Sequence, residues 1–284
     1  MSSIFLRTLF VAAVALAAAS SFGAQDASQA ASESAAVAGH ALDKVHRWLH
    51  EVAVPTIDPE TGLYKARGKW DYRDTAADCY PFFIWAAHVV EREVLNGPAG
   101  CVLGREQALC NTYGPLPVPW DFEAGAPAKD TEWDQVVFQA SEYVKDGLIA
   151  IVEVTGRDEW FDRMREIEDA LWETARVDTP FGKIPSTNIE VNGEQLQALA
   201  RLYTMTGEAK YLDWADRLAD YYFADDDFVV KRLRDHGCEI IGGLGLLHAV
   251  ESIYRLERVK EYEPRLKHVY DAILERGCNE DGLM

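Results

Sequence analysis

Four short stretches of the sequence place carboxylic acids close to aromatic or amide side chains at the starts of predicted helices. They are Lys69–Asp78, Trp120–Asp121 with Trp133–Asp134, Ser186–Glu194 and Arg234–Glu239. Aromatic rings can stack on sugar rings, and two carboxyl groups can act as an acid and as a base or nucleophile on a glycosidic bond. The stretches therefore indicate carbohydrate chemistry, provided that the fold brings them together.

Glu239 is a leading candidate for acid–base chemistry because it lies one turn into an otherwise apolar segment. A buried carboxylate is costly unless it is paired or faces a wet cavity, and a raised pKa would suit a general acid. The alternative is a structural acid paired with an arginine such as Arg234 or Arg201. The predicted catalytic residues are Glu239, Asp74, Glu190, Asp78 and Asp134.

The same stretches supply predicted substrate-binding residues. Asp74, Asp134 and either Asn188 or Asn192 have an alternative role, because Asp and Asn before a helix are usually N-caps. No P-loop, dinucleotide fingerprint, zinc-protease motif or nucleophile elbow occurs in the sequence, and we predict no cofactor and no metal site. The predicted substrate-binding residues are Trp70, Tyr72, Trp120, Trp133, Asn188, Asn192 and His236.

An internal repeat predicts how these stretches are positioned. Leu148 matches Leu199 after 51 residues, Thr155-Gly156 matches Thr206-Gly207, and a weaker third copy follows around 253–271. A period near 50 residues is typical of an array built from one supersecondary unit. Acids that recur on the second helix of each copy are interpreted as structural: Asp169, Asp220 and Asp271.

Each copy reads as two helices joined at Thr-Gly, with apolar residues spaced three and four apart. The glycine suits a left-handed C-cap, and Asp158 can cap the second helix. The first helices are apolar nearly all round and the second helices on one side only, which predicts an inner and an outer layer. An all-α ring, an α/α toroid, is therefore favoured over an open solenoid. The predicted inner helices are 75–95, 135–154, 188–205 and 237–256.

The N-terminal part of the chain has a different character. Residues 1–24 read as a secretory signal peptide, which predicts a periplasmic or secreted protein, with a retained anchor as the alternative. Residues 25–38 are predicted to be a flexible linker, and 39–284 the toroid domain, beginning with a helix near Gly39. Within that domain, 96–130 reads as a long loop in which Cys101 and Cys110 either pair or stay free.

Composition excludes some partners. The formal net charge is −19, from 28 basic and 47 acidic residues, which disfavours binding to nucleic acid and to anionic membranes. The cysteines have no spacing typical of a zinc site. A carbohydrate is the predicted partner, and the oligomeric state is not predicted.

The segments Glu194–Tyr222 and Gly237–Arg276 resemble the six-hairpin α/α toroids of carbohydrate-active enzymes, and Thr206–Ala219 is typical of their outer helices. The resemblance implies an exported glycoside hydrolase acting on polysaccharide or oligosaccharide. Polysaccharide lyases share the architecture, and a non-catalytic carbohydrate-binding or scaffold protein is a further alternative. Against six hairpins, the sequence accounts for about four, so we expect an incomplete ring. No catalytic residue transfers from the resemblance.

Overall fold

The structure is a computed structural model that describes residues 27–234 and 237–282, and the chain divides into two compact units, Met1–Ala53 and Val54–Met284. The predicted signal peptide lies outside the described residues. Among the helices of the described part, none combines the length and the apolar character that crossing a membrane requires.

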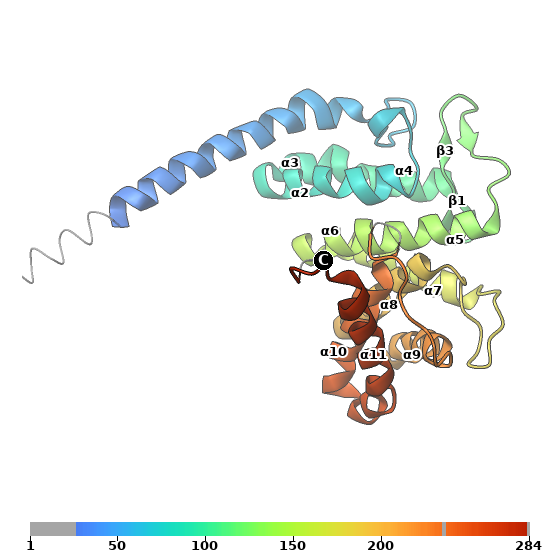
Figure 1. Ribbon diagram of the computed structural model, residues 1–284. Helices are drawn as coiled ribbons and strands as arrows, with labels where there is room; N and C mark the ends of the chain where they lie inside the picture. The colour runs from blue at the N-terminus through green and yellow to red at the C-terminus, as the bar shows by residue number, and fades with distance from the viewer. Residues whose placement is uncertain (1–26, 235–236, 283–284) are drawn as a thin grey trace, which may run out of the picture. The chain divides into compact units, whose positions relative to one another are not determined.

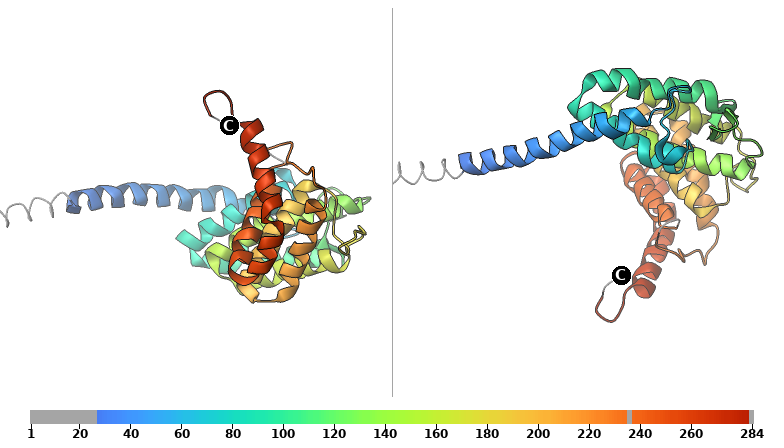
Figure 2. Two further views of the ribbon diagram at one scale, coloured as in Figure 1. Left: turned by 60° about the horizontal axis from the view of Figure 1, so that its bottom comes forward. Right: turned by 90° about the horizontal axis from the view of Figure 1, so that it is seen from above.

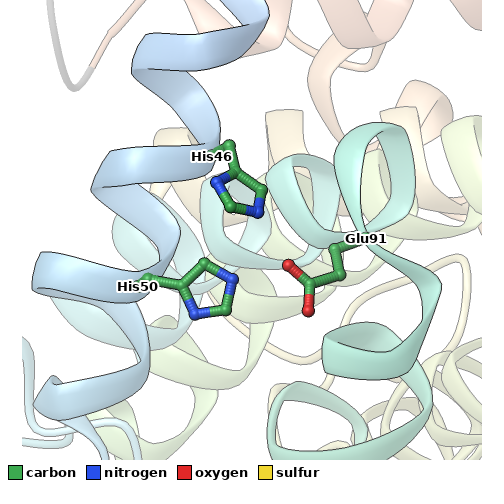
Figure 3. A group of neighbouring side chains, drawn as sticks. All are labelled: His46, His50 and Glu91. Atoms are coloured by element: carbon green, nitrogen blue, oxygen red, sulfur yellow. The ribbon is translucent and has the colours of Figure 1, made fainter.

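In the first unit, residues 27–48 form one continuous helix that runs into a π-helical turn, η1 (Leu49–Ala53). The helix begins before the predicted start near Gly39 and includes most of the stretch interpreted as a linker. The alanines that suggested low complexity there are also the strongest helix formers. His46 and His50 lie one turn apart on the same face, with ring centroids 4.7 Å apart (Figure 3).

In the described part of the second unit, helices occur in successive pairs (Figure 1). The first helices correspond closely to the predicted inner helices. The first pair also contains short connecting helices, η2 (Val54–Thr56), η3 (Ala66–Gly68), α3 (Arg92–Val94) and η5 (Leu95–Ala99). The four pairs are η4–α2 (Asp74–Cys79, Tyr80–Val90) with α4 (Gly100–Cys110); α5–η6–α6 (Trp133–Glu142, Tyr143–Leu148, Ile149–Thr155) with α7 (Asp158–Glu173); α8 (Ile189–Thr206) with α9 (Ala209–Phe223); and α10 (Glu239–Tyr254) with α11 (Leu256–Gly277).

The stretch predicted as a long loop, 96–130, contains a helix and two small antiparallel sheets. Helix α4 supplies the second helix of the first pair, and strands β1 (Asn111–Tyr113) and β2 (Leu116–Pro117) pair after it. Strands β3 (Trp120–Asp121) and β4 (Ala126–Pro127) form the other sheet. Cys101 and Cys110 are free thiols at opposite ends of α4, about 14 Å apart at a helical rise of 1.5 Å per residue, so the pairing considered above does not form.

The first helices lie side by side in chain order. Segment η4 packs on η6, α5 packs on α8, and α8 packs along α10, while α7, α9 and α11 pack on their own first helices (Figure 1, Figure 2). The structure thus establishes a mostly helical unit of stacked helix pairs with two small hairpin sheets. Closure of the pairs into a toroid stays a prediction.

Several details of the repeat are confirmed. Gly156 and Gly207 end the first helices α6 and α8 in the left-handed conformation, with φ of 61° and 72°. Two of the three recurring acids link neighbouring second helices: Asp169 on α7 pairs with Lys210 on α9 at 2.8 Å, and Asp220 on α9 pairs with Arg258 on α11. The third, Asp271, pairs with Lys267 within α11. Asp158, by contrast, is the first residue of α7 and makes no capping bond, because Arg157 occupies the N-cap position.

Helices α8 and α10 approach so closely that their backbones touch at two glycines. A Cβ atom on Gly193 would lie 2.2 Å from the amide nitrogen of Ile240, and one on Gly243 would lie 2.6 Å from the carbonyl oxygen of Gly193. Contacts this short leave no room for a methyl group unless the helices separate. The crossing therefore sets the position of the N-terminal end of α10 against α8.

We expect Gly193→Ala to lower the free energy of unfolding by at least about 2 kcal/mol, because the added methyl group overpacks this crossing. Gly104→Ala is the matched control. Gly104 is an exposed residue of α4 with open space around its Cα, so the same change should raise stability by about 0.5–1 kcal/mol. Urea denaturation of both variants measures the difference, and equal stability of the two would contradict the close crossing.

Candidate functional site

One pocket collects acidic side chains from the first helices of all four pairs. Its volume is about 340 Å³, and two basic side chains, Arg73 and Lys145, lie among the acids. We call it the acidic pocket. Its acidic members are Asp74 and Asp78 from η4, Glu142 from α5, Asp146 from η6, Glu190 and Glu194 from α8, and Glu239 from α10.

The first helices of three pairs each carry two of these acids, spaced four residues apart. The pairs are Asp74 with Asp78, Glu142 with Asp146, and Glu190 with Glu194. On a helix this spacing puts both side chains on one face, and like charges there destabilise an isolated helix. This unfavourable repulsion recurs on three neighbouring helices, and all three acid pairs line one pocket. The recurrence indicates a functional site more than a solvated surface.

Close packing of the first helices brings the acid pairs together. A Cβ on Gly147 of η6 would lie 2.8 Å from the carbonyl oxygen of Ala76 in η4, so these two π-helical segments touch through their backbones. The glycine crossing of α8 and α10 places Glu239 beside the first turns of α8 in the same way. Widened π-turns are frequent at functional sites, and both of these line the acidic pocket.

The inner part of the acidic pocket consists of Glu142, Asp146 and Glu194. One carboxylate oxygen from each lies within 4.8 Å of the others. The side chain of Glu194 is 1% exposed, and within the described part of the chain its Oε2 atom has no hydrogen-bond partner. Lys145 forms an ion pair with Asp146 at 2.8 Å and keeps part of its side chain in solvent.

Burial and mutual repulsion raise the pKa of three acids of the pocket. Burial, helped by the charge of Glu142, raises the pKa of Glu194 to about 10. Burial and the charges of Asp146 and Glu190 raise the pKa of Glu142 to about 7. The pKa of Asp78 is raised by the same causes, burial and then Asp146 and Asp74, although its side chain remains accessible. At neutral pH Glu194 is therefore protonated and Glu142 partly protonated unless a cation replaces the protons.

A second, larger hollow adjoins the acidic pocket and shares Arg73 and Asp74 with it. Its volume is about 800 Å³, and we call it the aromatic groove. The aromatic ring of Phe138 borders it, with the guanidinium of Arg73 5.6 Å from the ring centroid. Trp120 lines another side and is half-buried. The groove is large enough for a small ligand or a few sugar units.

Asp74 lies where the groove meets the acidic pocket, and its neighbours keep it ionised. Lys69 forms ion pairs with Asp74 and with Asp71, the latter at 2.7 Å. The hydrogen bond from Lys69 holds the pKa of Asp74 below its usual value. Asp71 performs the capping role that was the alternative for Asp74, since its Oδ1 accepts from the amides of Asp74 at 2.8 Å and Thr75 at 3.0 Å.

The predicted catalytic residues converge. Glu239, Asp74, Glu190 and Asp78 line the acidic pocket, and Asp134 lines the groove. The arginine pairing considered for Glu239 is not made by Arg201, which binds Glu153 at 2.9 Å. Glu239 has a buried Oε2 atom without a partner in the described part of the chain.

The predicted substrate-binding residues divide between the groove and the core. Trp120 and Asn188 line the groove, and Asn188 also caps α8 by accepting from the amide of Glu190 at 2.9 Å. Trp70 borders the groove, but its side chain is fully buried, with its ring edge-to-face with Tyr80. His236 lies outside the described residues.

Three predicted binding residues point elsewhere. Tyr72 is fully buried and donates to Glu106 at 2.8 Å, within a core network in which Arg163 also binds Glu106. Asn192 is buried and donates to the hydroxyl of Tyr222 at 3.0 Å. Trp133 lies under the guanidinium of Arg176, whose distance to the ring centroid is 3.5 Å. We find no groove or pocket contact for these three in the described part of the chain.

Sequence reasoning did not single out Glu142, Lys145, Asp146 or Glu194. They lie inside helices whose clearest sequence pattern is that of the apolar residues that form the core. The signal that would have found them is the spacing of four between acids, repeated on each of three first helices.

No protein-family model matches the chain, and no curated protein matches it. Function must therefore be argued from the acidic pocket and the aromatic groove.

The raised pKa values predict that stability falls as pH rises. In the window above the ordinary glutamate pKa, the folded chain keeps protons on Glu194 and Glu142 that the unfolded chain has lost, so unfolding becomes easier with increasing pH. We expect Glu194→Gln to leave stability at pH 5 nearly unchanged and to raise it by at least about 1 kcal/mol at pH 8, since the amide needs no proton.

Urea denaturation between pH 5 and pH 8 in the presence of EDTA measures this effect. Asp162→Asn, at an exposed position of α7, is the control and should follow the native pH dependence. Identical pH profiles for the native chain and Glu194→Gln would show that Glu194 is ionised and well solvated in the folded protein.

Proposed function

We propose that the protein is an exported glycoside hydrolase whose helix pairs are part of an α/α toroid. The observation that carries the proposal is the convergence of acids from four successive first helices on one pocket beside an aromatic groove. A hydrolase of this type needs one protonated and one ionised carboxyl group next to a surface that binds sugar rings. Export rests on the sequence of residues 1–24 alone.

Asp78 and Asp74 suit the two catalytic roles. Asp78 has a raised pKa and an accessible carboxyl group, so it can carry the proton that the leaving oxygen requires. Asp74 is kept ionised by Lys69 and lies at the junction of the groove and the acidic pocket. As the glycosidic C–O bond breaks, Asp78 transfers its proton to the departing oxygen, and the charge of Asp74 stabilises the positive charge that develops on the sugar. A water molecule then adds to the anomeric carbon and gives its proton to the ionised Asp78, which restores both carboxyl groups.

The groove supplies the contacts for the substrate. The half-buried ring of Trp120 and the ring of Phe138 offer apolar faces to sugar rings, while Asn188 and Asp134 offer hydrogen bonds to hydroxyl groups. Such a mixture of flat apolar surface and a few polar groups is typical of small-molecule sites.

The charge of the acidic pocket favours hydrolysis of neutral or amino sugars over lyase action on uronates. Seven acidic side chains stand against two basic ones there. A uronate carboxylate would meet a strongly negative field, whereas a neutral sugar would not. A non-catalytic carbohydrate-binding protein is the main alternative, and the experiment below separates it from an enzyme.

We expect the purified protein to release reducing sugar from a member of a panel of neutral oligosaccharides, and Asp78→Asn to lower kcat at least about 100-fold on that substrate. An aryl glycoside with a nitrophenolate leaving group needs no proton from the enzyme, so Asp78→Asn should lose far less activity on it. If Asp78 had a purely structural role, Asp78→Asn would lose activity on both substrates to the same extent.

Asp162→Asn serves again as the control and should keep native activity, since Asp162 is exposed on α7 away from both hollows. Binding of an oligosaccharide in calorimetry without any cleavage product would contradict the hydrolase and favour a binding protein. Equal activity of Asp78→Asn and the native chain on all substrates would remove Asp78 from the mechanism.

A further inference from the structure

We propose that Glu142, Asp146 and Glu194 form a binding site for a divalent cation, with Ca²⁺ as the ion that fits best. The proposal concerns the inner end of the acidic pocket and does not depend on the protein being a hydrolase. It rests on the spacing of three carboxylate oxygens, on an unpartnered buried carboxyl group and on the charge of the surroundings.

The spacing of the three carboxylates suits calcium. Their oxygens lie within 4.8 Å of one another. Two oxygens that both bind Ca²⁺ at about 2.3–2.6 Å can be at most about 5 Å apart, so the trio lies within the range that this ion can bridge. Mg²⁺ demands near-octahedral geometry and usually keeps several waters, so a buried set of three carboxylates suits Ca²⁺ better.

Glu194 is the observation that points to a ligand independently of the cluster. Its side chain is 1% exposed and lines the pocket, yet its Oε2 atom has no hydrogen-bond partner in the described part of the chain. Buried polar atoms are nearly always paired, and an unpaired carboxyl oxygen is expensive. A cation coordinated by Oε2 would satisfy this atom directly.

The groups that face the trio come from every neighbouring element. Asp78 on η4, Glu190 on α8 and Glu239 on α10 add negative charge, while Lys145 on η6 and Arg73 before η4 add positive charge. Lys145 pairs with one oxygen of Asp146 at 2.8 Å, so one of the two bases already has an acidic partner. The acids outnumber the bases around the trio, so the local field favours a divalent cation.

The cation would connect α5 and η6 to α8, and so hold two neighbouring first helices together at the pocket.

The test uses the full chain, stripped with EDTA and returned to metal-free buffer at pH 7.5, with CaCl₂ alone as the probe. We expect Tm to rise by at least about 5 °C at a hundredfold excess over Kd. MgCl₂ at the same concentrations should produce a smaller rise.

Glu194→Gln and Asp146→Asn should each abolish the rise in Tm caused by Ca²⁺. Glu194→Gln separates loss of calcium binding from loss of stability. It should be more stable than the native chain in EDTA at pH 8 and yet not respond to calcium. Glu251→Gln is the matched control: Glu251 is a buried acid of α10 with a pKa raised to about 8, outside the acidic pocket, so this variant should keep the full response.

No calcium-dependent rise in the native chain would overturn the proposal, as would an equal rise in Glu194→Gln and Asp146→Asn. A response to Mg²⁺ as large as that to Ca²⁺ would overturn the choice of ion. Asp78→Asn separates this proposal from the proposed hydrolase activity, because it should lose hydrolysis and still respond to calcium. A calcium response in a protein without any hydrolytic activity would support the cation site alone.

Discussion

Repulsion among buried carboxyl groups is the constraint on which the site depends. Three pairs of acids and Glu239 converge on a pocket of about 340 Å³, where two basic side chains of the described residues face them. Such a cluster cannot be fully ionised without a large cost in free energy, because nearby like charges interact strongly where water is scarce. The pocket must therefore hold protons or cations, and both the proposed acid–base chemistry and the proposed cation site depend on this requirement.

The surrounding helices must be rigid enough to resist that repulsion. The backbones of α8 and α10 touch at Gly193 and Gly243, and a second close approach joins η4 to η6 at Gly147. On the far side of the pairs, Asp169 with Lys210 and Asp220 with Arg258 tie each second helix to the next. Attraction between the second helices and close packing between the first helices thus oppose the separation of the acids at the pocket.

Much of this arrangement could be predicted because it repeats in the sequence. The Thr-Gly joints and the helical spacing identify the pairs, and equivalent positions in a stacked array must lie at the same end of the stack. That is why Glu239, Asp74, Glu190 and Asp78, far apart in number, line one pocket. Helix α4 completes the first pair, but it contains glycines and polar residues, and its apolar positions alone did not distinguish it from a loop.

Side-chain direction was harder to predict than position. Tyr72 and Asn192 lie in the expected stretches, but Glu106 and Tyr222 offer them buried hydrogen bonds, and that pairing is visible only when distant segments are brought together. The absence of a metal site was predicted from motifs with close spacing along the chain. The trio of Glu142, Asp146 and Glu194 draws its members from two helix pairs, so no single motif could contain it.

The proposed hydrolysis and the proposed cation binding use different parts of the acidic pocket, because the acids differ in access to solvent. Glu194 and Glu142 are buried, whereas Asp78 is accessible and Asp74 borders the groove. A cation at the inner acids would replace protons that are too tightly held, or too far from the groove, to serve a substrate. It would also reduce the negative field at Asp78, since Asp146 is one of the charges that raise the pKa of Asp78. Occupancy of the inner site would therefore tune the acid strength of the outer one, so that metal and proton chemistry in this pocket are coupled through Asp146.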